Sequence, residues 1–362
     1  MEYALSRMSE QVMTARANFR PLQIVGGGTK QFYGNPVYVG DVAPVKLQMS
    51  ALSGVLHYEP SELVLTAWAG TPLRVIQDAL DEQGQMLAFD PPFFGDQATL
   101  GGMVATGLSG PASFGYGALR HYVLGADLLD AQGRVLKFGG EVMKNVAGYD
   151  VSRLLAGSLG IFGAIVQVSL KVLPKPAMDV TQLFEFSEAQ ALAFCAGLRA
   201  RALPVKAAAW IEPNQLALRL CGAQAAVNAA MVSLGGETLS TGAARNWWDD
   251  FREQTHPFFQ ARPLWRLAVR ANTPALGFGP TAFDLGGEIR WLATDQPSES
   301  VRQAAVQAGG HATLFRWQDP QQVPGDGVFQ PLAPAVRTII KRLKLDLDPK
   351  SIFNSGRLVA GV

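Results

Sequence analysis

Cysteine, histidine and net charge are all scarce in this sequence of 362 residues. The two cysteines, Cys195 and Cys221, lie far apart in apolar runs, so they offer neither a disulfide framework nor a CxxC motif for a metal or an iron–sulfur cluster. None of the 4 histidines has HxxH or HxEH spacing, so no metal site is predicted. The formal net charge of +1 gives no strong field of one sign and indicates no nucleic-acid partner.

Long apolar runs are missing as well. No stretch approaches the roughly 18 uninterrupted apolar residues of a membrane span. Residues 1–19 place charges among their apolar positions and contain no small-residue cleavage site. These features predict a cytoplasmic chain without a transmembrane segment.

Glycine is the residue in excess. There are 38 glycines, above the roughly 7% of an average protein, and they crowd between Gly26 and Gly163. The length suits a domain of about 175 residues followed by a smaller one. Because the glycines crowd into the first half of the chain, we expect the binding site to lie there.

The first glycine tract follows a predicted helix over residues 6–18 and a predicted strand over 21–25. Successive N–H groups of such a tract can form a concave nest for phosphate oxygens, with the Thr29 hydroxyl and Lys30 as further donors. An ordinary glycine-rich turn is the alternative. The tract consists of Gly26, Gly27, Gly28 and Thr29.

Its spacing excludes two common nucleotide motifs. A Walker loop needs Ser or Thr directly after its lysine, and a GxGxxG fingerprint counted from Gly26 needs a glycine at position 31. Gln31 occupies both positions. A Rossmann or P-loop domain is therefore not expected.

Two more glycine-rich tracts follow. Residues 98–110 read ATLGGMVATGLSG, and their small side chains let the backbone lie against a large flat ligand. Residues 145–150 (NVAGYD) lead into GSLGIFG at 157–163 and then into an apolar strand over 164–172. Strand, glycine loop and helix thus alternate through this half of the chain.

In this order, GGGT, ATLGGMVATGLSG and GYDVSRLLAGSLGIFGAI resemble the FAD domain of the vanillyl-alcohol oxidase / p-cresol methylhydroxylase (PCMH) superfamily. The end of the chain, LDPKSIFNSGR at 347–357, is similar to the closing D-P-x-x-x-x-N-x-G segment of the same superfamily. The resemblance covers the first 176 residues and the closing segment.

The resemblance implies roles for three groups of residues. The first would cradle the FAD pyrophosphate through backbone N–H groups, the second would line the pyrophosphate and isoalloxazine side, and the third would lie near the adenine. The groups are Gly26, Gly27, Gly28 and Thr29; Thr99, Gly101, Gly102, Gly107 and Ser109; and Gly157, Gly160 and Ile165. Ile165 also suits a place in the core.

Covalent flavin attachment in this superfamily uses a histidine or cysteine in these loops. Here the first loop carries Thr29 and Lys30 instead, so the resemblance implies non-covalent FAD. His57 lies at a predicted strand edge and His121 follows Arg120. We interpret both histidines as structural.

Glycine thins out after Pro176, where the sequence predicts a domain boundary. The order β, α, β, β, α, β then suits an antiparallel sheet with helices on one face, similar to the cap of the same superfamily. The predicted strands cover 179–186, 205–211, 215–221, 264–270, 288–293 and 311–317. Helices are expected from the Ser187/Gln190 capping box to about Arg201, and over 223–234 and 301–308.

The predicted fold class is α+β. A PCMH-type FAD-binding domain of two subdomains covers 1–176, a smaller ferredoxin-like antiparallel cap covers 177–325, and a C-terminal segment over 326–362 returns to the FAD domain.

The cap indicates less about chemistry. An arginine is the natural partner of a substrate carboxylate, and solvation of an exposed sheet face is the alternative role. The aromatic residues between 247 and 259 suit a core or an interface, and we interpret them as core. No catalytic base is predicted. The candidate arginines are Arg266, Arg270, Arg290 and Arg316.

The short cap, GEVMKNVAGYDVSRLLAGSLG at 140–160 and DLDPKSIFNSGRL at 346–358 are most similar to the FAD-binding E subunits of bacterial glycolate oxidases. That resemblance implies a complex with a larger flavin subunit and an iron–sulfur subunit, peripheral at the inner face of the cell membrane. The implied reaction oxidises glycolate, or a related 2-hydroxy acid, to the 2-oxo acid and passes electrons to a respiratory acceptor. Two alternatives stay open: a stand-alone flavin oxidase or dehydrogenase of an alcohol or lactone, and a non-catalytic flavin-bearing scaffold.

Overall fold

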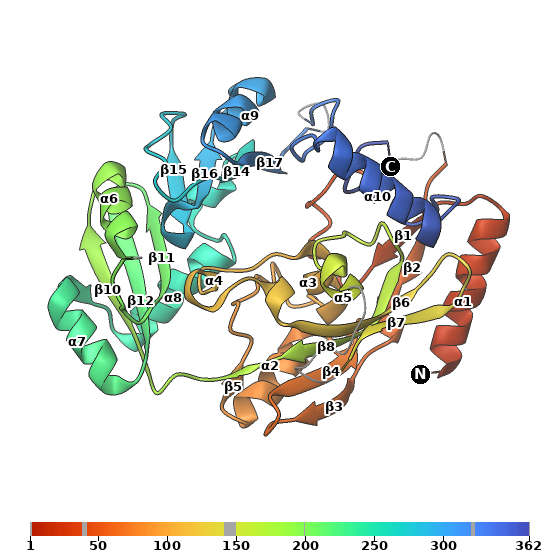
Figure 1. Ribbon diagram of the computed structural model, residues 1–362, viewed down its shortest axis with the longest axis horizontal. Helices are drawn as coiled ribbons and strands as arrows, with labels where there is room; N and C mark the ends of the chain where they lie inside the picture. The colour runs from red at the N-terminus through yellow and green to blue at the C-terminus, as the bar shows by residue number, and fades with distance from the viewer. Residues whose placement is uncertain (1, 38–41, 141–149, 199, 320–322, 362) are drawn as a thin grey trace.

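The structure is a computed structural model, and it describes residues 2–37, 42–140, 150–198, 200–319 and 323–361. Figure 1 shows the N-terminal half of the chain on the right and the cap on the left. The chain passes into the cap after β9 (Leu173–Pro174) and returns along α10 (Pro334–Leu347), which lies over the N-terminal half.

The N-terminal half contains a parallel strand pair and a five-stranded antiparallel sheet. Helix α1 (Glu2–Ala17) covers the pair of β1 (Leu22–Val25) and β2 (Val45–Gln48) through its apolar residues Met8 and Val12. The sheet has the order β3 (Val55–Glu59), β4 (Val64–Trp68), β8 (Ala164–Lys171), β6 (Val123–Leu129) and β7 (Val135–Gly139). The smaller elements are α2 (Leu73–Glu82), β5 (Gln85–Met86), α3 (Leu100–Thr106), α4 (Ser113–Tyr116) and α5 (Val151–Leu155).

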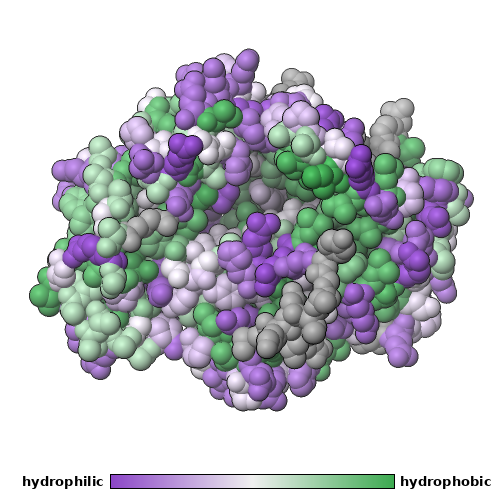
Figure 2. Space-filling model, viewed as in Figure 1, coloured by the Kyte–Doolittle hydropathy of each residue, from purple (hydrophilic) through white to green (hydrophobic). Residues whose placement is uncertain are grey.

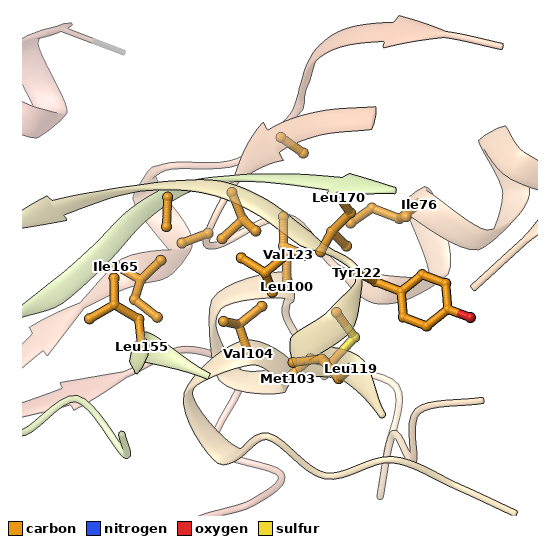
Figure 3. Close-up of a cluster of buried hydrophobic side chains, with 14 of the residues drawn as sticks. Ile76, Leu100, Met103, Val104, Leu119, Tyr122, Val123, Leu155, Ile165 and Leu170 are labelled. Atoms are coloured by element: carbon orange, nitrogen blue, oxygen red, sulfur yellow. The ribbon is translucent and has the colours of Figure 1, made fainter. Parts of the chain in front are cut away.

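Helix α3 carries the second glycine tract and is held by the core of this half. Its side chains Leu100, Met103 and Val104 lie among residues of β6 and β8, including Val123 and Ile165 (Figure 3). Burial of each such side chain contributes roughly 1.5–3 kcal/mol. Packing of this apolar face therefore fixes the position of α3 in the N-terminal half.

The cap is one antiparallel sheet of eight described strands in the order β13-β10-β12-β11-β15-β16-β14-β17. The predicted antiparallel cap is confirmed, but its sheet is larger than a single ferredoxin-like unit because β11 pairs with β15 and joins two groups of strands. The strands are β10 (Met178–Glu185), β11 (Val205–Ile211), β12 (Gln215–Gly222), β13 (Glu237–Thr238), β14 (Leu264–Ala268), β15 (Thr281–Asp284), β16 (Ile289–Ala293) and β17 (His311–Arg316).

Helices cover both faces of this sheet, contrary to the predicted single face. Helices α6 (Glu188–Leu198) and α7 (Gln224–Leu234) pack against Ala208 and Leu218, whereas α8 (Thr241–Arg252) packs against the alternate residues of the same strands. The aromatic residues of and after α8 are core, as predicted: Trp248, Phe251 and Phe259 are buried. Helix α9 (Ser298–Gln307) packs against β17.

Helix α10 is attached to the N-terminal half through the buried side chain of Lys344. Lys344 Nζ lies 2.7 Å from Asp348 Oδ2 and also donates to the carbonyl oxygens of Ile161 and Phe353. Asp348 in turn accepts the backbone N–H groups of Ile352 and Phe353. The rest of α10 is largely exposed, and Figure 2 shows hydrophobic and hydrophilic residues intermixed over it.

Candidate functional site

A narrow slot runs between the first glycine loop, α3 and the turn before β8. Its volume is about 90 Å³, which suits a narrow part of a ligand. Nine of the residues predicted to contact the cofactor line it: Gly26, Gly27, Gly28, Thr29, Thr99, Gly101, Gly102, Gly160 and Ile165. The tertiary structure therefore brings together residues from three separate tracts of the sequence.

Close backbone packing explains why glycine occupies the slot. A Cβ atom on Gly27 would lie 1.5 Å from the carbonyl oxygen of Gln97, and one on Gly26 would lie 2.3 Å from Thr99 Oγ1. On α3, a Cβ atom at Gly101 would lie 2.7 Å from that of Ala69. No larger residue fits at these positions without displacing the neighbouring chain.

Backbone donors in the first loop are unpaired. Within the described part of the chain, the N–H groups of Gly27, Gly28, Thr29 and Lys30 have no hydrogen-bond acceptor. Gly28 has a φ of +77°, which turns the successive N–H groups toward one concave side. Such a nest binds phosphate oxygens, so the residues present fit a pyrophosphate.

Lys30 follows the nest, and the sequence suggests it as a further donor to phosphate. In the structure its side chain binds a backbone carbonyl oxygen instead. Its Nζ is buried and donates to the carbonyl oxygen of Phe93 at 3.0 Å. Burial lowers the pKa of Lys30 to about 8, although the carboxylate of Glu253 acts to raise it. Lys30 therefore ties the glycine loop to residues 93–94, which lie next to the cap.

Three predicted residues lie outside the lining of the slot. Gly107 ends α3 with a φ of +65°, and a Cβ atom there would lie 2.9 Å from Gly157 Cα. Ser109 Oγ accepts the backbone N–H of Leu119 at 2.9 Å. Gly107 and Gly157 thus allow α3 to approach the next loop, and Ser109 shapes a turn.

Two slot residues were not assigned from the sequence although they lie in the recognised closing segment. Asn354 accepts the N–H of Ile24 at 2.9 Å and donates to the carbonyl oxygen of Leu159 at 2.7 Å. Arg357 is buried, and its Nη2 donates to the carbonyl oxygens of Gln31 and Tyr33. These bonds hold the glycine loop and the turn before β8 against each other. A hint in the sequence was the N-x-G of the closing segment.

The third glycine-rich tract is described only in part. Residues 141–149, which carry the EVMKNVAGY portion of the resemblance, lie outside the described residues. Gly157 and Gly160 after them are described.

A second cavity, of about 1210 Å³, lies between the N-terminal half and the cap. Thr29 lines both the slot and this cavity, so the two are adjacent. Residues of α2 and of the loop at 86–96 form one wall, and residues of α8 and β17 form the other. An extended dinucleotide can therefore lie with its pyrophosphate in the slot and one end at the cavity.

The structure separates the four candidate arginines of the cap. Arg290 is fully buried and donates to the carbonyl oxygens of Gly287 and Thr273, which is a structural role. Arg266 lies over the ring of Trp291, and Arg270 is exposed. Of the four, Arg316 lines the cavity.

The described residues contain no group of three or more His, Cys, Asp or Glu side chains placed to hold a metal ion. Among the described helices, none combines the length and the apolar character that spanning a bilayer requires.

Comparison with known proteins identifies the class. The FAD binding domain family matches residues 6–139. Alkyldihydroxyacetonephosphate synthase has the same fold, with a TM-score of 0.66 over 97% of this chain and 75% of that chain at 15% identity. The fold and the slot therefore define a PCMH-type FAD-binding protein, and FAD is the cofactor, as predicted.

Sequence relatives define the family more closely. The chain is 40% identical to the glycolate oxidase subunit GlcE of Escherichia coli K12 over 97% of its own length and 96% of that protein. It is 30% identical to the glycolate oxidase subunit GlcD of Bacillus subtilis and 34% identical to a D-lactate dehydrogenase of Archaeoglobus fulgidus, but over 39% and 35% of this chain. The chain belongs to the family of the glycolate oxidase subunit GlcE.

Proposed function

We propose that this chain is the FAD-binding subunit of an oxidoreductase complex that converts glycolate, or a related 2-hydroxy acid, to the 2-oxo acid. The observation that carries the proposal is the glycine-lined slot, with its unpaired N–H groups, that opens at Thr29 onto a large cavity under the cap. Similarity to GlcE along nearly the whole chain supports the substrate class.

Bound FAD supplies the two-electron acceptor for the substrate C–H hydride. The residues of this chain would hold it: Gly27, Gly28 and Thr29 through backbone N–H groups at the pyrophosphate, and Ile165 on the β8 side of the slot. The lining residues of the slot in the described chain include neither histidine nor cysteine, which supports non-covalent binding.

Electrons must then leave the chain. Cys195 and Cys221 are both buried in the cap core, and no spacing of cysteines suits a cluster. We therefore propose a larger flavin subunit and an iron–sulfur subunit as partners, with a respiratory acceptor beyond them. A location in the cytoplasm, at the inner face of the membrane through this complex, stays a prediction.

An anaerobic absorbance titration of the purified chain with glycolate tests the proposal. We expect flavin absorbance bands at about 450 nm. Acid precipitation should release the flavin into the supernatant, because it is not covalently held. Bleaching by glycolate, in the chain alone or after addition of the partner subunits, is the expected response. A chain without flavin bands would contradict the proposal, and bands that bleach in neither case would indicate a scaffold.

A further inference from the structure

We infer that the cavity under the cap contains a carboxylate-binding site formed by Arg316 and Arg262, which places the 2-hydroxy acid in this chain. The inference rests on the proposed function and deepens it, because it assigns the substrate to named residues. It depends on the position of these two cations, on their lack of acidic partners, and on the adjacency of the cavity to the slot.

Ion pairs account for the other half-buried arginines around the cavity. Arg219 pairs with Asp179 at 2.6 Å, and Arg252 pairs with Asp90 at 3.0 Å. Arg74, which is more exposed, pairs with Asp96. Arg245 is exposed to solvent on α8. Arg262 and Arg316 are partly buried, and neither has a carboxylate within ion-pair distance in the described chain.

Arg316 is held in place by neutral groups. Its Nε and Nη2 both donate to Gln254 Oε1, at 3.1 and 3.0 Å, and its guanidinium lies 3.8 Å from the ring centroid of Phe32. Nη1 makes no hydrogen bond to the described residues. The ring covers one face of the guanidinium, so a carboxylate must approach in the guanidinium plane, along the Nη1 edge.

Arg262 adds a second positive charge. Its Nη1 donates to the carbonyl oxygens of Phe259 and Ala261, which orients the side chain without neutralising it. Burial, together with repulsion by Arg262, lowers the pKa of Arg316 to about 10. The two arginines stay charged at neutral pH, so they leave a partly buried excess of positive charge that favours the binding of a small anion.

The ligand class follows from this geometry. The planar fork of Arg316 selects a carboxylate, and the aromatic side chains Phe32 and Phe94 beside it provide an apolar wall. Phe32 and Thr29, three residues apart in one loop, both line the cavity, so this carboxylate site lies on the slot side. A small 2-hydroxy monocarboxylate fits these conditions.

The test uses the FAD-loaded full chain and measures the glycolate concentration that gives half of the anaerobic change in the flavin spectrum. Arg316→Met should raise that concentration about 10- to 100-fold, because a hydrogen-bonded charge is lost from the site. Arg316→Lys, which keeps the charge but not the planar fork, should give an intermediate value. Arg270→Met, at an exposed cap arginine just after β14, is the matched control and should behave as the unmodified chain.

The outcomes are separable. If Arg316→Met and Arg316→Lys retain FAD and respond to glycolate as the unmodified chain does, the inference is wrong. An FAD-loaded chain that does not respond to glycolate at any concentration also overturns it, while FAD binding by this subunit stands. A chain that does not bind FAD overturns both. Should Arg316→Met fail to retain FAD, Arg316→Lys with bound FAD decides, and an unchanged half-saturation would reject the site.

Discussion

The two halves of this protein build their sites from opposite materials. In the FAD-binding half, the slot is made of backbone: unpaired N–H groups and glycines at which a Cβ atom would collide with the neighbouring chain. In the cap, the wall of the cavity is made of side chains, with arginines, Gln254 and aromatic rings placed by the packing of α8 and β17. A site made of backbone requires a particular residue type, here glycine, at each position. A site made of side chains requires only that packing brings suitable side chains together.

The largest effect is expected from loss of Lys344, whose bonds hold the C-terminal segment against the FAD-binding half. Replacing Lys344 by Met leaves Asp348 buried without its cation, which should destabilise the fold by about 3–5 kcal/mol. The exposed Lys341→Met on the same helix should change stability by less than about 0.5 kcal/mol. Urea unfolding of both variants measures the difference, and equal midpoints would mean that the ion pair does not hold the segment.

A smaller effect should follow from filling the backbone site itself. Gly27→Ala would place a Cβ atom against the carbonyl oxygen of Gln97, so the loop must shift and the nest must open. We expect the FAD dissociation constant to rise about 100-fold, which corresponds to roughly 2.7 kcal/mol. Flavin fluorescence during titration of the apoprotein measures it. Unchanged FAD affinity would show that the loop tolerates displacement and that the contrast between the halves is overstated.

The cap should respond to pH through a buried carboxyl group. Burial raises the pKa of Asp284 to about 7, although the N–H of Leu285 and the charge of Arg266 act to lower it. The pKa of the Asp284 carboxyl is therefore higher in the folded chain than in the unfolded chain. For this reason its contribution to folding stability is complete below about pH 4 and is lost as the pH rises through 7.

Asp284→Asn removes this dependence. The gain in stability of the variant over the unmodified chain should therefore be about 2–3 kcal/mol larger at pH 8 than at pH 5. Thermal unfolding at the two pH values measures the gain. Asp295→Asn, at an exposed aspartate of the cap, is the control. Parallel stability curves for the Asp284 variant and the unmodified chain would contradict this account of the cap.

The smallest effect sharpens the contrast between glycines. Gly197 lies exposed in α6 of the cap, and a Cβ atom there would meet no other atom within 4 Å. Gly197→Ala should stabilise the chain by about 0.5 kcal/mol, because alanine loses less backbone entropy in a helix. FAD affinity should not change. Denaturant unfolding and the same fluorescence titration check both, and a loss of FAD affinity would mean that the two halves are coupled more tightly than their contacts indicate.

Prediction from the sequence succeeded where local sequence preferences and tertiary packing favour the same structure. The capping box at Ser187 and Gln190 is present, with Gln190 Oε1 accepting the N–H of Ser187 at 2.9 Å. Strand β11 has the predicted bounds, 205–211. It failed at β15, a strand of four residues between glycine and proline-rich turns, because so short a segment has no detectable periodicity. It also missed α8 as a cover for the second sheet face, since its apolar residues face a partner far away in the chain.

The sequence by itself determined the FAD-binding half. Glycine at 26, 27 and 101 is required by the close approach of backbones, and a requirement on the backbone is visible in the residue type alone. Only the tertiary structure decided which cap arginine can meet a ligand. Arg290 and Arg316 both lie on predicted strands of the cap. Arg290 is buried and donates to carbonyl oxygens, whereas Arg316 faces the cavity. That choice depends on which strands pair and which loops cover them, and pairing between distant segments leaves no local mark on the chain.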